Sequence, residues 1–528
     1  MFSLETWNAR IDAFIEEENQ TVGREMPVYR IYCQDGNDRS GGGLYNETVT
    51  ADTIGRFARA LGDSNPLYSD PSYARLRYGA GDGPAISAPG AANPVPAISA
   101  SGAADPNPAI SASGAPVSSA AWQQYGAADA PASGFRALRA AAASPAGIAA
   151  PPLLECCICS TFIGGRLPRL RGVTVFDAGT KWERFAPILA GDTFSAVTRS
   201  LGVREITKKE KIKKEAVDRL LVRSHEIDLK NQRGELVSRL TARSMIRCAA
   251  PQADQEKSAF GKNESPDVCE KTDSLADREE AGSSAASGAA DREEAGSSAA
   301  SGAADREEAG SSASSGAADR EVAASAAGAR PRYTQDQLDR IYANLDAQFD
   351  GKFRRGDQIR YWEDVETGEE LPDQAAGPYD ESDGQSLMAA IGVSNAFATK
   401  WGTLRARRGG QVTDPETGAR RLPIDRHNSD LIARTQGLPR ALVSGIHSQT
   451  LLAKSVGDWM GDAGMLRSLD CRCKKPLYFG DVTTQRGRVT GKYVRDGRFF
   501  VRLKMEAVRQ DGVVHTEAEA EVELPRRI

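Results

Sequence analysis

The sequence predicts an α+β fold made of two similar halves, with low-complexity sequence inside the first half and between the two. A helical pattern, a polar loop, an apolar segment and a run of antiparallel strands occur before residue 250 and again after residue 331. The low-complexity tracts lack the large apolar side chains that a packed core requires. We therefore expect an N-terminal half over 1–249, a linker over 250–331 and a C-terminal half over 332–528.

The two low-complexity tracts span 84–149 and 250–331. In the first tract "PAIS" recurs at positions 84, 96 and 108. In the second, "DREEAGSSAASGAA" begins at Asp277 and Asp291, with degenerate copies at Asp305 and Asp319. Repeats of small and charged residues cannot offset the entropy cost of ordering, and they offer no hydrophobic face for stacking as a solenoid. We predict that both tracts are disordered insertions.

Composition excludes several classes of protein. The formal net charge of −5 provides no basic field for nucleic acid or for an anionic membrane. The start of the chain lacks the basic region and the apolar core of a secretory signal, and no apolar run is long enough to span a membrane. The eight cysteines form no matched pair of C-x-x-C motifs, so no zinc site is expected. These features predict a reduced, cytoplasmic protein without nucleic-acid partner, membrane span or metal.

The first half contains one helix signal, one loop, one apolar segment and a strand meander. Thr50 is a suitable N-cap for a helix with apolar residues at positions 54, 57, 58 and 61, and the loop "GDSNPLYSDPSYAR" (62–75) follows it. The apolar "APPLLECCICSTFIGG" (150–165) predicts a buried helix in which the cysteines pack as small hydrophobic residues. Strand-like runs cover 172–185, 192–203 and 218–247, with hairpin-turn chemistry around Gly234.

The second half repeats this order. "YWEDVETGEELP" (361–372) leads to a helical run, "ESDGQSLMAAIG" (381–392). The polar "IDRHNSDLIARTQGLP" (424–439) precedes the apolar "GIHSQTLLAKSVGDWM" (445–460), and three strand-like runs fill 481–525. The repetition predicts an internally duplicated fold.

The loop at 62–75 carries a resemblance to a known family. It matches the pattern Gly-Asp-x-Asn-Pro-apolar-His-x-Asp, except that Tyr68 stands at the histidine position, and so resembles the MaoC-like dehydratase and (R)-specific enoyl-CoA hydratase family. Further matches are "W-E…F-x-P-I…GD" (182–192), "YWEDV…G-E-E-L-P" and "GDWMGDAGMLRSLD…KPLYFGDV". The resemblance implies tandem hot-dog domains, each a curved antiparallel sheet wrapped around one central helix.

The resemblance implies an acyl-CoA hydratase or dehydratase that interconverts 2-enoyl-CoA and 3-hydroxyacyl-CoA. Coenzyme A would enter only as part of the substrate, with no other cofactor, and a homodimer is allowed. The family holds a water with an Asp and a His, and a histidine can both take and return a proton near neutral pH. Tyr68, with an ordinary pKa of about 10, would be a poor base. We therefore expect Asp63, Asn65 and Tyr68 to line the substrate pocket, with capping of the following turn as the alternative for Asp63.

His427 occupies the histidine position in the second half. In "HNSDLIAR" the Ala-Arg pair lies six and seven residues after His427, as it does after Tyr68 in "YSDPSYAR". The expected Asp position, five residues before His427, holds Leu422. We predict His427 as the catalytic base, with Asp425 and Asp430 as local carboxylate candidates and Asp63 as a remote one. The structural alternative is a surface histidine in a polar loop.

Gly445 opens the second apolar segment. The resemblance implies that backbone N–H groups around Gly445 and Ile446 polarise the thioester carbonyl. His447 either contacts substrate or is a buried helix histidine bonded to backbone. His225 and His515 stand among charged neighbours in strand-like runs and are expected to be solvated.

Two features keep other functions open. Neither half has an intact Asp–His spacing, which favours a non-catalytic acyl-CoA-binding subunit. A hot-dog thioesterase would need a carboxylate in the core helix, and Glu155 is the residue that keeps this alternative open. The cations Arg472, Lys474 and Lys475 either meet the phosphates of coenzyme A or form a solvated edge.

Overall fold

The computed structural model of the chain describes residues 3–26, 44–78, 138–159 without 139 and 145, 173–206, 218–250, 328–392 and 412–527. The predicted disorder of 84–137 and 251–327 therefore lies outside the described residues.

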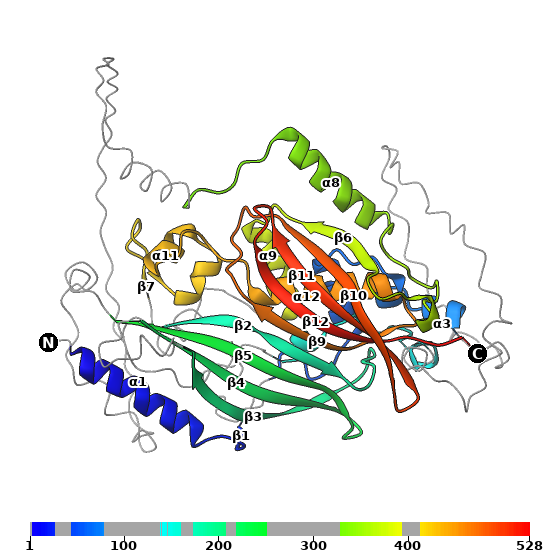
Figure 1. Ribbon diagram of the computed structural model, residues 1–528, viewed down its shortest axis with the longest axis horizontal. Coiled ribbons are helices and arrows are strands. Elements are labelled where there is room, and N and C mark those ends of the chain that lie inside the picture. Colours follow the sequence, from blue (N-terminus) through cyan, green and yellow to red (C-terminus); the bar gives the residue numbers. More distant parts are fainter. Residues whose placement is uncertain are drawn as a thin grey trace, which may run out of the picture. The chain divides into compact units, whose positions relative to one another are not determined.

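Ten strands form one sheet whose order is symmetric about its centre (Figure 1). From one edge to the centre run β1 (Glu25–Met26), β3 (Phe194–Glu205), β4 (Asp218–Asn231), β5 (Leu236–Ala249) and β2 (Val173–Arg184). From the centre to the other edge run β9 (Met465–Cys473), β12 (Val514–Glu523), β11 (Arg498–Arg509), β10 (Thr483–Arg495) and β6 (Glu370–Ala376). Each half thus repeats the same arrangement, and antiparallel pairing of β2 with β9 joins them. The predicted duplicated α+β fold with tandem hot-dog sheets is confirmed.

The central helix of the second half is α12 (Gly445–Met460). Nearly all of its residues are buried, and it contacts strands of both halves, including β2 and β9. At 1.5 Å per residue, a helix of this length spans about 24 Å. Its apolar side chains, among them Leu452, Val456 and Trp459, are buried. The length of α12 matters for the site, because it separates the predicted functional residues into two groups.

The counterpart in the first half is much shorter than predicted. Within the described residues, the apolar segment 150–165 contains only the single turn α6 (Glu155–Ile158), and 160–165 lie outside them. Pro151 and Pro152 precede this turn, and each proline disfavours helical geometry in the residue before it. The cysteines of this segment are buried and free, as predicted.

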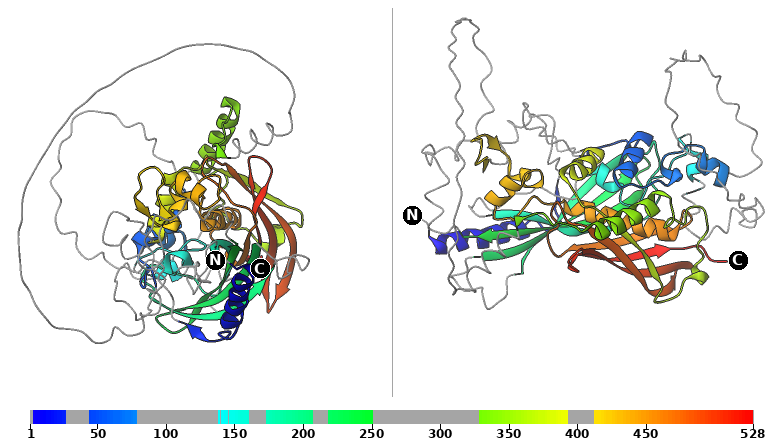
Figure 2. Two further views of the ribbon diagram at one scale, coloured as in Figure 1. Left: turned by 90° about the vertical axis from the view of Figure 1, so that its left-hand side faces the viewer. Right: turned by 90° about the horizontal axis from the view of Figure 1, so that it is seen from above.

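Paired flanking helices repeat the duplication. The side chain of Thr50 caps α2 (Ala51–Ala60) as predicted, accepting a hydrogen bond from the N of Thr53 at 3.0 Å. The predicted second helix is α9 (Glu381–Ile391), and the two helices contact each other. At the N-terminus, α1 (Leu4–Asn19) packs Trp7, Ile11 and Phe14 against strands of the first half (Figure 2, dark blue). Among the helices in the described part of the chain, none is long and apolar enough to cross a membrane.

The end of the first low-complexity tract belongs to the folded half. Leu138, Ala141, Ile148 and Ala149 are buried in the main core, although the sequence predicts an insertion up to residue 149. Isolated large apolar residues in an alanine-rich run are enough to bury this segment once the neighbouring core surrounds it. The predicted insertion therefore extends too far along the chain.

Candidate functional site

A cavity of about 210 Å³ lies at the N-terminal end of α12. Both halves of the chain line it. Its polar lining includes Asp177 of β2, His427, Ser444, Gly445, Lys475 and His515. Its apolar lining includes Phe176, Met245, Met388 and Ile391. A mainly apolar cavity with a few convergent polar groups is the usual form of a small-molecule site.

His427 is half-buried at the end of the 3-10 helix η5 (Pro423–His427) and faces this cavity. Its Nδ1 lies 3.0 Å from the carbonyl oxygen of Leu442. Because a carbonyl can only accept, Nδ1 carries the proton and Nε2 keeps its lone pair. Burial and the neighbouring Arg426 lower the pKa of His427 to about 4, so the ring is neutral at pH 7. The structure thus places His427 in a cavity and not on the open surface.

The two local carboxylate candidates hold the loop that carries His427. The carboxylate of Asp425 accepts hydrogen bonds from Nε of Arg421 at 2.8 Å and from the N of Leu422 at 3.3 Å. The Oδ1 of Asp430 accepts from the N of Ala441 at 2.8 Å. Neither carboxylate is among the described residues that line the cavity.

A carboxylate that the sequence analysis did not single out lies beside Gly445. A Cβ atom at position 445 would come within 2.7 Å of Oδ2 of Asp177, so this approach requires glycine. The N of Gly179 donates to Oδ1 of Asp177 at 2.7 Å, and Nε2 of Gln449 donates to Oδ2 at 2.9 Å. Burial raises the pKa of Asp177 to about 6, against the opposing effects of these two donors and of Arg243. The available signal in the sequence was an Asp two residues before a Gly within a strand, a pattern typical of a β-bulge.

Arg426 joins the loop of His427 to the strand of Asp177. Its Nη2 donates a hydrogen bond to the carbonyl oxygen of Val175, and its guanidinium lies 5.3 Å from the ring centre of Phe176. His427 follows Arg426 in the sequence, and Asp177 follows Phe176. One contact therefore joins the two segments whose titratable side chains, His427 and Asp177, line the same cavity.

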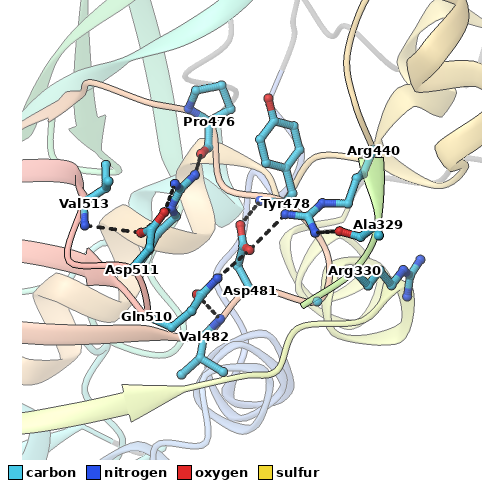
Figure 3. A network of polar contacts seen from close by, with 12 residues as sticks. Ala329, Arg330, Arg440, Pro476, Tyr478, Asp481, Val482, Gln510, Asp511 and Val513 are labelled. Atoms are coloured by element: carbon cyan, nitrogen blue, oxygen red, sulfur yellow. Dashed lines mark hydrogen bonds and ion pairs between the residues drawn. The ribbon is translucent and has the colours of Figure 1, made fainter. Parts of the chain in front are cut away.

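The basic residues at the cavity lie on a loop that a polar network anchors (Figure 3). Asp481 accepts hydrogen bonds from Nη2 of Arg440 at 3.0 Å, from Nε2 of Gln510 at 2.9 Å and from the N of Tyr478 at 3.0 Å. Lys474 and Lys475 precede Tyr478 and Asp481 of this network in the sequence. Both lysines are exposed, and both line the cavity. The loop therefore holds cations at the point where the cavity meets solvent.

The predicted residues of the first half lie at the other end of α12. The Oδ1 of Asp63 accepts from the N of Asn65 at 3.0 Å, which is the predicted cap of the turn. The Nδ2 of Asn65 donates at 2.8 Å to Oδ1 of Asp462, which follows the last residues of α12. Burial, reinforced by Asp458, raises the pKa of Asp63 to about 6. The charges that act on Asp63 include Asp458 and Lys454, about 20 and 14 Å along α12 from Gly445, so Asp63 lies too far away to hydrogen-bond to His427.

Tyr68 lines a second, smaller cavity of about 60 Å³. The larger cavity has Gly445 at the start of α12. In the smaller cavity the residue that precedes the corresponding helix, α6, is Pro152. The central strand β9 contributes Leu466 to the smaller cavity, whereas the central strand β2 contributes Asp177 to the larger one. No histidine is among the described residues that line the smaller cavity. Its carboxylate is Asp462, which already accepts hydrogen bonds from Asn65, Tyr73 and Tyr78.

The remaining histidines are buried. His447 stacks edge-to-face on Tyr379 with ring centres 5.3 Å apart and is not among the described residues that line the cavity. The expected solvation of His225 and His515 is wrong, since they are 4% and 1% exposed. The charged neighbour of His225 on the same strand face, Arg223, is buried with it. His515 stands at a register shift of β12 against β11, which interrupts the alternation of inward and outward side chains.

Glu155 is bound in a structural ion pair. Its carboxylate accepts from Nε of Arg184 at 2.9 Å and from Oγ of Ser238 at 2.7 Å. Burial alone would raise the pKa of Glu155, but Arg184 and Ser238 outweigh it and the pKa is lowered. A carboxylate held in this way is poorly placed to attack a thioester. Within the described residues, no group of three or more His, Cys, Asp or Glu side chains is arranged to hold a metal ion.

Comparison with known proteins yields matches among solved structures. No family model and no curated protein matches the chain. A structure named MaoC-like dehydratase is 14% identical, covering 90% of this chain and 95% of its own, with a TM-score of 0.39. A MaoC-like dehydratase from Phytophthora capsici is 11% identical, with coverages of 72% and 85% and a TM-score of 0.33.

A third match is a conserved hypothetical protein of Mycobacterium tuberculosis with a double hotdog fold. It is 11% identical, with coverages of 66% of this chain and 74% of its own and a TM-score of 0.29. Two of these three structures carry the name of the family that the sequence motifs resemble, and the third carries the name of the fold.

Proposed function

We propose that the chain is an acyl-CoA hydratase or dehydratase that interconverts 2-enoyl-CoA and 3-hydroxyacyl-CoA at the 210 Å³ cavity. The observation that supports this most directly is the pairing of two features in one cavity. A neutral His427 offers a lone pair at Nε2, and the start of the 16-residue helix α12 lies beside it. The first feature can hold a water and the second can stabilise an oxyanion.

The thioester carbonyl would lie at the first turn of α12. The first backbone N–H groups of a helix have no acceptor within the helix, and the helix dipole adds a partial positive charge there. Negative charge grows on the thioester oxygen when water adds to C3 of the enoyl group. Gly445 keeps this position open, because no side chain covers the backbone.

Water would add across the C2=C3 bond. His427 accepts a hydrogen bond from the water through Nε2, the water oxygen bonds to C3, and a proton is delivered to C2. The net reaction adds one water molecule to the substrate, and it requires no oxidant or reductant. The apolar residues Met245, Met388 and Ile391 suit an acyl chain, and Lys474 and Lys475 suit the phosphates of coenzyme A.

The test follows the absorbance of the enoyl-thioester band with crotonyl-CoA and with a longer-chain enoyl-CoA. We expect wild type to remove the band without releasing free thiol, and His427→Ala to lose at least about a hundredfold in rate. His225→Gln is the control, since His225 is a buried histidine of β4 that lies outside the cavity lining.

Two outcomes would favour the other functions. Binding of acyl-CoA without turnover would indicate a non-catalytic subunit. Release of free thiol from saturated acyl-CoA would indicate a thioesterase.

A further inference from the structure

The loop of His427 lacks the carboxylate that the family pattern places there, and the cavity receives one from the other half of the chain. Leu422 stands at the expected position, while Asp425 and Asp430 accept hydrogen bonds that hold the loop. Among the described lining residues, Asp177 of β2 is the carboxylate at the cavity.

A β-bulge aims Asp177 at the start of α12. The register of β2 against β5 shifts between Asp177 and Gly179, and Gly179 has a φ of +98°. A Cβ atom at position 179 would lie 2.1 Å from the carbonyl oxygen of Cys471, so only glycine allows this bulge beside β9. The same bulge brings the N of Gly179 to 2.7 Å from Oδ1 of Asp177. The strand therefore holds the carboxylate in one direction.

The opposite side of the carboxylate contacts α12. Oδ2 of Asp177 accepts from Nε2 of Gln449 at 2.9 Å and lies against the bare Cα of Gly445. If the thioester oxygen lies at the first turn of α12, Asp177 would lie next to C2, the carbon between that carbonyl and C3. The contact of Arg426 with Val175 and Phe176 brings His427 to the same space.

We propose that Asp177 is the catalytic base of this site and that it carries a proton between water and C2 of the substrate. This inference rests on the proposed hydratase function. It assigns His427 the task of orienting the water through Nε2.

The step balances with the groups at hand. In hydration the water oxygen bonds to C3, the C2=C3 electron pair moves toward C1, and the thioester oxygen becomes an enolate oxygen at the first turn of α12. One water proton moves to Asp177, and the other stays on the new hydroxyl, bonded to Nε2 of His427. Protonated Asp177 then gives its proton to C2, and the thioester carbonyl reforms. Dehydration follows the same path in reverse.

The protonation states agree with this division of work. Burial raises the pKa of Asp177 to about 6 and lowers the pKa of His427 to about 4. At neutral pH both groups are in their basic forms, and the carboxylate is the stronger base of the two. Because the pKa of Asp177 lies near neutral pH, the protonated carboxyl can also give the proton back.

The experiment compares Asp177→Asn with Asp470→Asn in the full-length chain. Asp470 is a carboxylate of the adjacent strand β9 that binds Nη2 of Arg243 at 2.7 Å and does not line the cavity. For Asp177→Asn we expect kcat for crotonyl-CoA hydration to fall by about 10²- to 10⁴-fold. The Kd for butanoyl-CoA, which is saturated and cannot react, should change less than about threefold, and Asp470→Asn should keep its kcat within the same limit.

Each result decides the question. If wild type hydrates no enoyl-CoA, the proposed function fails and this inference fails with it. If wild type is active and Asp177→Asn keeps kcat within threefold, the inference alone is overturned. A parallel loss of butanoyl-CoA binding would also overturn it, since Asp177 would then be needed for binding. Asp177→Ser, which also removes the carboxylate, replaces Asp177→Asn if circular dichroism shows that the asparagine variant does not fold.

Discussion

Gln449 of α12 forms hydrogen bonds both to Asp177 and to two later residues of the same strand, β2. The Nε2 of Gln449 donates to Oδ2 of Asp177 at 2.9 Å, while its Oε1 accepts from the N of Thr180 at 3.1 Å and from Nε1 of Trp182 at 3.2 Å. The two donors fix the amide so that its NH₂ group faces the carboxylate. Gln449 lies one helical turn after Gly445, so this side chain locks the start of α12 onto β2.

Replacing Gln449 by Met is expected to affect both stability and pH dependence. The variant leaves the N of Thr180 and Nε1 of Trp182 without their acceptor, which should lower the free energy of unfolding by about 1–3 kcal/mol. The hydrogen bond from Gln449 lowers the pKa of Asp177, so its loss should move the acidic limb of kcat/KM to higher pH. Urea denaturation and a pH–rate profile measure the two effects.

The control for this variant is Gln374→Met. Gln374 is buried and its Nε2 donates to Oδ2 of Asp458 at 3.0 Å, near the other end of α12. We expect this variant to lose stability and to keep the acidic limb of wild type. An unchanged limb in Gln449→Met would mean that the hydrogen bond does not set the pKa of Asp177.

The ionised side chain of Asp177 is expected to lower the free energy of unfolding at neutral pH. The groups that face it are Arg243 of β5, Cys471 and Cys473 of β9, and Arg426 and His427 of the loop. The pKa of Asp177 in the folded state, about 6, lies above the ordinary value of 3.8. The folded state therefore binds the proton of Asp177 more tightly than the unfolded state does. The resulting stabilisation is fully present below pH 3.8 and is lost as the pH rises through 6. The free energy of unfolding of Asp177→Asn, relative to wild type, should therefore rise between about pH 4 and pH 6 and stay level above.

Urea denaturation at pH 4, 5, 6 and 7 measures this difference. Taking the difference between the two proteins removes the contribution of Asp63, whose pKa is also raised to about 6. A difference that stays constant over this range would mean that Asp177 titrates alike in the folded and unfolded chains.

The duplicated fold could be predicted from the sequence because its signals are local. Thr50 caps a helix through a neighbour three residues away, and the spacing from Tyr68 and His427 to their Ala-Arg pairs aligns the two halves by simple counting. The shortness of α6 could not be predicted, because periodicity alone does not tell one helical turn from a longer buried helix.

Asp177 could not be predicted because its role depends on contacts between distant segments. In the sequence it is one acidic residue in a strand-like run. It becomes part of a site only when the bulge at Gly179 turns it toward Gly445 and Gln449 of the other half. The burial of His515 was missed for a related reason, since it depends on a register shift of β12 against β11 that a strand pattern does not reveal.

The ion pair of Glu155 is expected to contribute to stability and not to activity. The side chains of Arg184 and Glu155 are 12% and 2% exposed, so Arg184→Met would leave a buried charge without its partner. We expect a loss of about 3–5 kcal/mol in the free energy of unfolding. Arg247→Met breaks a more exposed pair with Asp218 and should cost about 1 kcal/mol or less.

Activity gives the second readout for the same pair. Glu155→Gln, assayed for enoyl-CoA hydration and for thiol release, should keep the wild-type kcat per folded molecule. A selective loss of thiol release in this variant would support Glu155 as the group of a thioesterase.

A histidine at position 68 should not restore activity to a protein that lacks His427. The cavity beside Tyr68 is about 60 Å³ and contains Pro152, which has no backbone N–H. Its carboxylate, Asp462, is held by hydrogen bonds from Asn65, Tyr73 and Tyr78. We therefore expect the double variant Tyr68→His/His427→Ala to remain as inactive on crotonyl-CoA as His427→Ala, while Tyr68→His alone keeps wild-type kcat. Recovery of more than about a tenth of wild-type activity in the double variant would contradict this, because it would show that a histidine alone makes the smaller cavity an active site.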